Sequence, residues 1–143
     1  MRLLGVDLGD RRVGFAVTDE AELLAVPSGF AAVRTLAEAL EAVLAKAEAE
    51  GAELVVVGNP LNMDGRPGPK SREAVEFGDM VRRAGRDAVM WDERLTTSEA
   101  TRLLREAGHS RKRRKTLIDA NSAQRLLESY LGFRRRGGAR TDV

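Results

Sequence analysis

The chain has 143 residues, a formal net charge of +2 and no cysteine. The length suits one domain of roughly 100–150 residues, and the lack of cysteine excludes disulfides and thiolate zinc sites. A single histidine, His109, cannot build an imidazole metal site alone, and no apolar run approaches the ~20 residues of a membrane span. Since the first residues lead into a strand pattern rather than a signal peptide, we expect a cytoplasmic protein without membrane contact.

The charge is unevenly distributed along the chain. Residues 1–60 carry a net charge of −5, whereas residues 61–143 carry +7. The excess lies in two basic runs, and such runs are typical of surfaces that bind polyanions. A solvated loop and a frayed tail are the alternatives; we favour polyanion contact for the first run and solvation for the second. The first run is Arg111, Lys112, Arg113, Arg114 and Lys115, and the second is Arg134, Arg135 and Arg136.

Three strands open the chain. Residues 3–9 form an apolar strand that holds a single carboxylate, Asp7, and residues 12–18 return beside it as a hairpin. Residues 23–33 add a third strand with a turn at Pro27. The three segments together predict a meander.

Strands and helices then alternate. Thr35 and Glu38 form a capping box that opens a helix, and Gly51 ends it. The continuous apolar run at residues 54–57 is typical of a strand covered on both faces. The remaining predicted elements are a polar loop over residues 59–69, a helix capped by Ser71, a strand at residues 88–91, a helix from Thr96 to Gly108, a basic loop, and a final helix over residues 118–131.

This order of elements, βββαβαβαα, predicts an α/β fold with one mixed five-stranded sheet flanked by helices. We expect a single domain over residues 1–133. The basic segment over residues 134–143 is expected to be a disordered tail.

Asp7 is the residue that the strand pattern explains least. An ionised carboxylate removed from water must be paired, metal-bound or protonated. Sites in open α/β sheets form where the parallel strands end. If the fourth and fifth strands run parallel to the first, Asp7, the loop that starts at Asn59, and the pair Asp92 and Glu93 meet at one edge. The alternative for that pair is two surface acids that end a strand.

Asp119 is a further candidate acid. It heads the apolar stripe of the last predicted helix, four residues before Ala123 and seven before Leu126. The helix dipole alone also favours an acid in the first turn, so stabilisation of the helix is the competing interpretation. The need of Asp7 for a partner favours a shared site.

Carboxylates that converge without histidine or cysteine suit a hard divalent cation, Mg²⁺ or Mn²⁺, as one or two ions. Such ions activate water and neutralise charge on a phosphoryl group under attack, and a basic rim would hold a phosphate backbone. The aromatic content of only 4% argues against base stacking and for backbone or shape contacts. The residues therefore predict hydrolysis of phosphodiester bonds.

Four segments resemble the YqgF/RuvX family. They are Gly-Val-Asp-Leu-Gly at residues 5–9 with Arg-Val-Gly at residues 12–14, Val-Gly-Asn-Pro-Leu-Asn-Met-Asp-Gly at residues 57–65, Asp-Glu-Arg-Leu-Thr-Thr at residues 92–97, and Asp-Ala at residues 119–120. The similarity runs from about residue 3 to residue 131. The first segment alone is a weak signal, because actin-like ATPases and sugar kinases share it, whereas the second and third together are highly specific.

The resemblance implies a ribonuclease H-like fold and an endonuclease that matures the 5′ end of pre-16S ribosomal RNA. Members are alternatively described as Holliday junction resolvases, which act in DNA recombination and repair. Residue by residue, Asp7, Glu93 and Asp119 correspond to the metal-binding acids of the family. The sequence departs from the family pattern at Asn59 and at residues 121–122, and neither departure affects an acid.

From these assignments we expect Asp7 to bridge the metal ions, while Glu93 and Asp119 hold one each and orient the attacking water. Thr96 serves equally well as a helix cap or a phosphate contact, whereas for Asn59 we favour a loop-shaping role over a substrate contact. The predicted nucleic-acid-binding residues are Arg11, Arg12, Asn59, Arg94, Thr96 and Thr97, together with the basic run from Arg111 to Lys115.

The expected partner is nucleic acid, either pre-16S rRNA, in ribosomal precursor particles, or a four-way DNA junction. A junction demands two paired cuts and hence a symmetric homodimer, whereas the RNA reaction is compatible with a monomer. Two other classes remain open. One is a catalytically idle nucleic-acid-binding module, and the other is a fragment of an actin-like ATPase, which needs two such domains.

Overall fold

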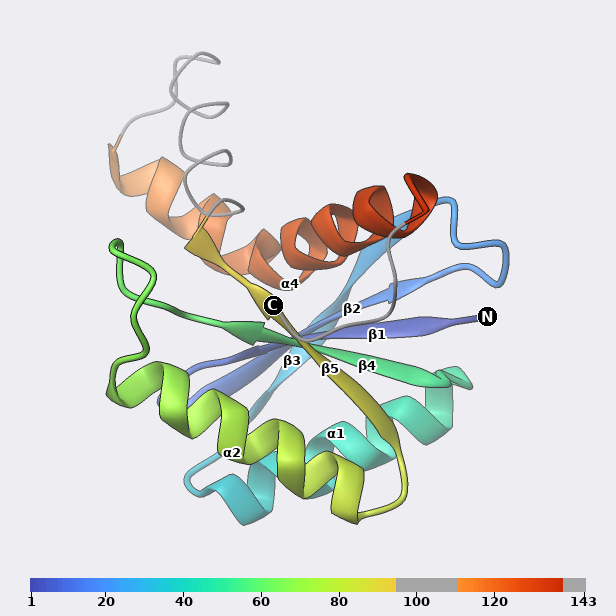
Figure 1. Ribbon diagram of the computed structural model, residues 1–143, viewed down its shortest axis with the longest axis horizontal. Helices are drawn as coiled ribbons and strands as arrows, with labels where there is room; N and C mark the ends of the chain where they lie inside the picture. Colours follow the sequence, from blue (N-terminus) through green and yellow to red (C-terminus); the bar gives the residue numbers. More distant parts are fainter. Residues whose placement is uncertain (95–110, 138–143) are drawn as a thin grey trace.

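A central sheet with helices on both faces organises the computed structural model, with α1 and α2 on one side and α4 on the other (Figure 1). The structure describes residues 1–94 and 111–137, with side chains for residues 1–94 and 122–137. The strands are β1 (Leu3–Leu8), β2 (Arg12–Thr18), β3 (Ala25–Ala32), β4 (Leu54–Asn59) and β5 (Asp87–Asp92), and the helices are α1 (Leu36–Glu50), α2 (Pro69–Arg83) and α4 (Arg111–Arg135).

The strand order in the sheet is β3-β2-β1-β4-β5. β1, β2 and β3 pair antiparallel, while β4 runs parallel to β1 and β5 runs parallel to β4. The predicted mixed five-stranded sheet is therefore confirmed. Because three parallel strands end at the same edge, the carboxyl ends of β1, β4 and β5 bring Asp7, Asn59 and Asp92 to one side of the sheet.

The caps of α1 follow from local sequence. The Thr35 hydroxyl accepts a hydrogen bond from the Glu38 backbone N–H at 3.1 Å, and the Glu38 carboxylate accepts one from the Arg34 N–H at 2.8 Å. Gly51 ends the helix with a φ of 66°, and its N–H donates to the last carbonyls of the helix. Glycine adopts this left-handed backbone conformation without the steric penalty that a Cβ would bring. The predicted start and end of this helix are confirmed.

α2 begins earlier than predicted. Its first residue is Pro69, and Gly68 precedes it without a side-chain cap. Proline has its φ preset for the first helical turn and lacks an N–H that would go unpaired there. The prediction that Ser71 caps this helix is therefore wrong. Ser71 lies inside the first turn, is only 1% exposed, and donates its hydroxyl hydrogen to Asn59 Oδ1 at 2.5 Å.

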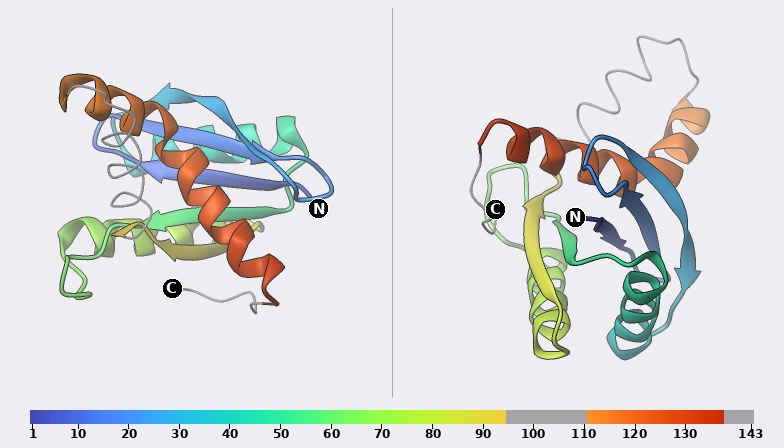
Figure 2. Two further views of the ribbon diagram at one scale, coloured as in Figure 1. Left: turned by 90° about the horizontal axis from the view of Figure 1, so that it is seen from above. Right: turned by 90° about the vertical axis from the view of Figure 1, so that its right-hand side faces the viewer.

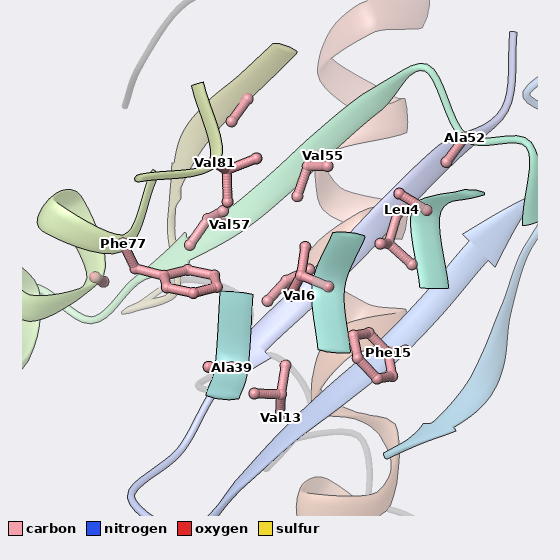
Figure 3. Packing of buried hydrophobic residues seen from close by; sticks show 14 of the residues in the cluster. Leu4, Val6, Val13, Phe15, Ala39, Ala52, Val55, Val57, Phe77 and Val81 are labelled. Carbon is pink, nitrogen blue, oxygen red and sulfur yellow. The ribbon is translucent and has the colours of Figure 1, made fainter. Parts of the chain in front are cut away.

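Alternating residues of the sheet feed two separate cores. On β4, Val55 and Val57 join the cluster under α1 and α2, which includes Phe77 (Figure 3). Leu54 and Val56 of the same strand face α4 and join the other cluster. The continuous apolar run at residues 54–57 is thus explained, since both faces of β4 are covered.

The basic run at residues 111–115 was predicted to be a loop, and this is wrong, because α4 already begins at Arg111. Lys and Arg are good helix formers, and no glycine or proline interrupts the chain between residues 111 and 131. The helix also continues to Arg135, past the tail boundary predicted at residue 134. Arg134 is ordered there by Glu22, whose carboxylate accepts from its Nε at 2.7 Å.

α4 crosses the sheet obliquely on the face opposite to α1 and α2, and its general direction is opposite to that of β1 (Figure 2). Its middle packs against Gly5, where a Cβ would lie 3.0 Å from the Ala123 carbonyl oxygen. Its end reaches Glu22, which also accepts a hydrogen bond from the Met1 amine at 3.2 Å. Moving from Ala123 towards the start of α4 therefore leads to the carboxyl end of β1.

No helix in the described part of the chain is long and apolar enough to cross a membrane. The helix predicted from Thr96 to Gly108 lies outside the described residues.

Candidate active site

Asp7 lies near the end of β1, half buried, in the middle strand of the sheet. Its partner across the hairpin is Gly14. Among the atoms of the described residues, a Cβ at Gly14 would approach only the Asp7 Cβ, at 3.8 Å. The carboxyl group therefore projects from the α4 face, and no described side chain lies beside it on β2.

Glu93 follows directly after β5. Its backbone N–H donates to the Asn59 carbonyl at 3.1 Å, which continues the pairing of β4 and β5 by one step. Its side chain lies across Gly58, because a Cβ built on Gly58 would sit 2.6 Å from the Glu93 Cδ. Glycine at residue 58 thus leaves the space that the Glu93 carboxyl group occupies.

The Glu93 and Asp7 carboxyl groups are hydrogen-bonded to each other. Burial, the negative charge of Asp7 and that hydrogen bond raise the pKa of Glu93 to about 9, with a smaller contribution from Asp92. Among the described residues no cation offsets these effects at Glu93. The protein thus holds two acids together at a cost in stability, one of them protonated at neutral pH.

Asp92 is the opposite case. Both of its carboxylate oxygens accept hydrogen bonds from Arg94, the shortest from Nη2 at 2.7 Å, and one also accepts from the Arg94 backbone N–H at 2.9 Å. The hydrogen bonds from Arg94 hold the pKa of Asp92 below its usual value. Asp92 is therefore a partner for Arg94, and this leaves Glu93 as the residue of the pair that contacts Asp7.

Arg94 was predicted to contact phosphate. In the structure its side chain contacts the loop between β4 and α2. Its Nη1 donates to the Met63 carbonyl at 3.4 Å, and it lies beside Gly65, where a Cβ would be 3.2 Å from Nη1. Gly65 has a φ of 86°, which favours glycine. The described contacts of Arg94 hold this loop to the end of β5.

Asn59 does not fit its predicted role as a nucleic-acid contact. It is only 8% exposed, and its Oδ1 accepts the Ser71 hydroxyl. An amide buried in this way satisfies a neighbouring hydroxyl and fixes the start of α2 against β4. The sequence assigned no partner to Asn59, because the contact joins residues on two different elements.

Of the remaining predicted site residues, some have described side chains and others do not. Arg11 and Arg12 are exposed at the β1–β2 turn, and both line a cleft of about 880 Å³ that also contains Asp7 and Ala123. The backbone of Asp119 lies in α4 one turn before Ala123, towards the carboxyl end of β1. Its side chain and those of the basic residues from Arg111 to Lys115 lie outside the described residues, as do Thr96 and Thr97.

The donor set suits a hard divalent cation. Among the described side chains no group of three or more metal-ligating residues comes together. Asp7 and Glu93 nevertheless supply two oxygen donors in contact, and a cation between them would remove the repulsion that raises the pKa of Glu93. The residues present therefore fit a divalent metal of the kind expected.

Comparison with known proteins identifies the family. A family model described as "RuvX: Holliday junction resolvase" matches residues 1–132. The chain belongs to the RuvX family. Three relatives with the name "Putative pre-16S rRNA nuclease" match nearly the whole chain. The relative from Halothermothrix orenii is 39% identical and covers 93% of this chain and 96% of its own length, and the one from Desulforudis audaxviator is 38% identical and covers 96% of this chain and 98% of its own length. The relative from Clostridium botulinum is 39% identical and covers 92% of this chain and 96% of its own length. The family predicted from the sequence is confirmed.

Solved structures show the same fold at low sequence identity. RuvC of Thermus thermophilus is 17% identical, covers 98% of this chain and 99% of its own, and superposes with a TM-score of 0.61. The Fowlpox virus Holliday junction resolvase is 11% identical, with coverages of 92% and 99% and a TM-score of 0.54. These likenesses confirm the predicted ribonuclease H-like fold for this RuvX family member.

Proposed function

We propose that this chain is a divalent-metal-dependent endonuclease that hydrolyses phosphodiester bonds in structured nucleic acid. The observation that carries the proposal is the contact between the Asp7 and Glu93 carboxyl groups at the carboxyl edge of the sheet. Acids held together by the fold, with a strongly raised pKa, are typical of functional sites rather than of structural ion pairs. The family and the nuclease names of its relatives agree with this chemistry.

Asp7 and Glu93 are the described residues that would hold the metal, and we assign Asp119 as the third acid. Mg²⁺ and Mn²⁺ both accept carboxylate oxygens. When bound, such an ion supplies charge neutralisation at the phosphate and lowers the pKa of a bound water. The chain itself contributes a fixed position for the acids, because Asp7 lies on a central strand and Glu93 is seated over Gly58.

For the substrate we propose the 5′ end of pre-16S rRNA in ribosomal precursor particles in the cytoplasm, since relatives covering nearly the whole chain carry that name. The alternative is a four-way DNA junction, supported by the description of the family model and by the fold of RuvC. The exposed Arg11 and Arg12 beside the cleft suit the phosphate backbone of either substrate. The RNA reaction is compatible with a monomer, whereas the junction requires a homodimer.

The decisive experiment offers the purified protein pre-16S RNA and a four-way DNA junction side by side, with Mn²⁺, with Mg²⁺ and without metal. Asp7→Asn is expected to lose about 100-fold or more of the metal-dependent cleavage. Asp79→Asn, which changes a half-exposed acid on α2 that pairs with Arg82, is the matched control and should cut like the wild type.

Undiminished cleavage by Asp7→Asn contradicts the proposal. Cuts at the mature 5′ end select the RNA function, and paired symmetric cuts select the junction. Binding of either substrate without any turnover indicates an idle binding module, and nucleotide hydrolysis indicates the ATPase class.

A further inference from the structure

Three residues on neighbouring strands form one row across the α4 face of the sheet. Asp7 of β1 pairs with Gly14 of β2, and Gly14 pairs with Phe30 of β3. Residues directly opposite each other in a sheet point to the same face. That face is the one covered by α4, because Gly5, two residues before Asp7, contacts Ala123. Asp7 and Phe30 therefore project from one face, two strand spacings or roughly 10 Å apart.

No side chain in the described part of the chain fills the middle of this row. Among the described atoms, a Cβ at Gly14 would approach only the Cβ of Asp7 within 4 Å, so the gap between the carboxylate and the ring holds none of the described side chains. The cleft of about 880 Å³ is lined by Asp7, Gly14 and Phe30 among others. This volume is in the range of small-ligand sites, and the cleft is continuous from the candidate catalytic acid to Phe30.

Phe30 is unusually accessible for a phenylalanine. It is 67% exposed, although it lies in a strand rather than in a loop. The Arg12 guanidinium lies over its ring, 5.5 Å from the centroid. A cation beside an exposed ring is the combination by which proteins hold single-stranded nucleic acid, with bases stacked on the ring and phosphates near the cation. The low aromatic content argued against base stacking, but it did not show where the few aromatic residues lie.

We propose that Phe30 is a stacking platform for an unpaired nucleobase of the substrate strand, with the backbone passing Arg12 and crossing Gly14 to Asp7. The inference rests on the proposed nuclease function. Nucleic acid is favoured over an apolar protein partner, because the cleft joins the ring to a cation and to the catalytic edge. The span of roughly 10 Å is about three stacked nucleotides at 3.4 Å each, so the stacked base lies within a few nucleotides of the bond that is cut.

Stacking can be measured directly in metal-free protein, where no strand is cut. Short single-stranded RNA and DNA oligonucleotides, each with one 2-aminopurine, report stacking as a loss of fluorescence. Phe30→Ala is expected to lose most of the quenching and to bind at least about fivefold more weakly. Phe30→Trp is expected to keep both. The RNA and DNA arms show which strand the platform prefers, and a response in either supports the proposal.

A matched control lies on the same strand. Val26 is 49% exposed and pairs with Val17, which belongs to the core under α1 and α2, so its side chain projects from the other face. Val26→Ala should bind and quench like the wild type.

Cleavage with Mn²⁺ provides a second arm, in which an abasic nucleotide is moved one position at a time along the substrate. At one position the wild type should slow as much as Phe30→Ala slows on the intact substrate. The variant should show no additional loss there, because two changes that remove the same contact do not add.

The outcomes separate this inference from the nuclease function. Unchanged quenching and affinity in Phe30→Ala overturn the stacking platform, even if cleavage is normal. Quenching that depends on Phe30, in a protein that cuts neither substrate, supports the platform and contradicts the nuclease. A wild-type dimer that dissociates on Phe30→Ala without a change in quenching overturns the platform and assigns this face to a second copy of the chain.

Discussion

Two adjacent acids at the end of β5 have opposite environments. Asp92 is held by Arg94 and has a lowered pKa, whereas Glu93 contacts Asp7 and has a raised one. Successive residues along an extended chain point to opposite sides, so neighbours in sequence meet different partners. Of these two acids, Glu93 is therefore the one whose carboxyl group lies against Asp7.

The raised pKa of Glu93 predicts how stability depends on pH. The pKa is about 9 in the folded, metal-free protein against 4.5 for an unperturbed glutamate. The folded state thus binds a proton that the unfolded state has lost, and the stability of the wild type should fall as the pH rises from about 4.5 towards about 9. Glu93→Gln removes this dependence and should raise the unfolding free energy at mildly alkaline pH by about 1 kcal/mol or more.

Urea unfolding of metal-free wild type and Glu93→Gln across this pH range measures the effect. Addition of Mn²⁺ should stabilise the wild type more than the variant, because the variant lacks one anionic ligand. Parallel pH profiles for the two proteins would show that Glu93 titrates normally.

At the scale of elements, the position of the site depends on the contacts at the carboxyl ends of β4 and β5. The Glu93 carboxyl group rests over Gly58, and Asn59 and Ser71 join β4 to α2. Arg94 ties the same loop to the end of β5. The backbone geometry of two parallel strands, rather than any single contact, thus sets the position of Glu93.

Gly58→Ala tests this dependence. The new Cβ would displace the Glu93 carboxyl group, which is the free end of a flexible side chain, so stability should change little. Because the carboxyl group would move away from Asp7, cleavage should fall roughly 10- to 100-fold. Rates of metal-dependent cleavage and thermal unfolding, measured together, check both parts. Gly132→Ala in α4 is the control and should retain activity; equal activity in both variants would rule out the role of Gly58.

Local patterns predicted most of these elements. The meander, the capping box at Thr35 and the αL end at Gly51 were read correctly, because each is determined by residues close in sequence. Asp7 was recognised because a lone acid contradicts its apolar strand. The parallel course of β4 and β5 entered the sequence argument only as a condition, and the pairing of β1, β4 and β5 meets that condition.

The sequence predictions were wrong where the structure depends on contacts between residues far apart in the sequence or where charge was taken as the sign of a loop. Ser71 was assigned as a cap, but its partner Asn59 lies across the boundary between strand and helix. The run from Arg111 was assigned as a loop on its charge, although its residues form helices readily. The space that Gly58 leaves for the Glu93 carboxyl group has no signature in the sequence, because a glycine directly after an apolar run is also common in turns, whereas Gly58 lies inside β4.

At the scale of the whole molecule, the N-terminus and the end of α4 meet at Glu22. Its carboxylate accepts from the Met1 amine and from Arg134, and its carbonyl accepts from Arg135 at 3.2 Å. The hydrogen bond from Arg134 holds the pKa of Glu22 below its usual value. The β2–β3 turn, the N-terminus and the end of α4 are thereby joined at one point.

Glu22→Gln is expected to lower the unfolding free energy by about 1 kcal/mol near neutral pH, since the group is only partly buried and solvent screens it. A depressed pKa means that the wild type loses this stabilisation as the pH falls through the folded pKa, so the difference between the two proteins should shrink in acid. Glu48→Gln, which removes a highly exposed partner of Arg86, is the control and should have a smaller effect. A pH-independent difference would show that the charge of Glu22 is not involved.

Because α4 runs from the carboxyl edge of the sheet back to Glu22, the contacts at Glu22 can affect residues at the far end of the helix. An α-helix is stiff along its axis and rises 1.5 Å per residue, so the backbone of Asp119 lies about 22 Å along the helix from Arg134. Contacts that hold one end of a helix also restrain the position of its other end along the helix axis. We therefore expect a substitution in the surface ion pair at Glu22 to shift α4 along its axis and so to alter the sheet edge where Asp7 lies, although no side chain between them is changed.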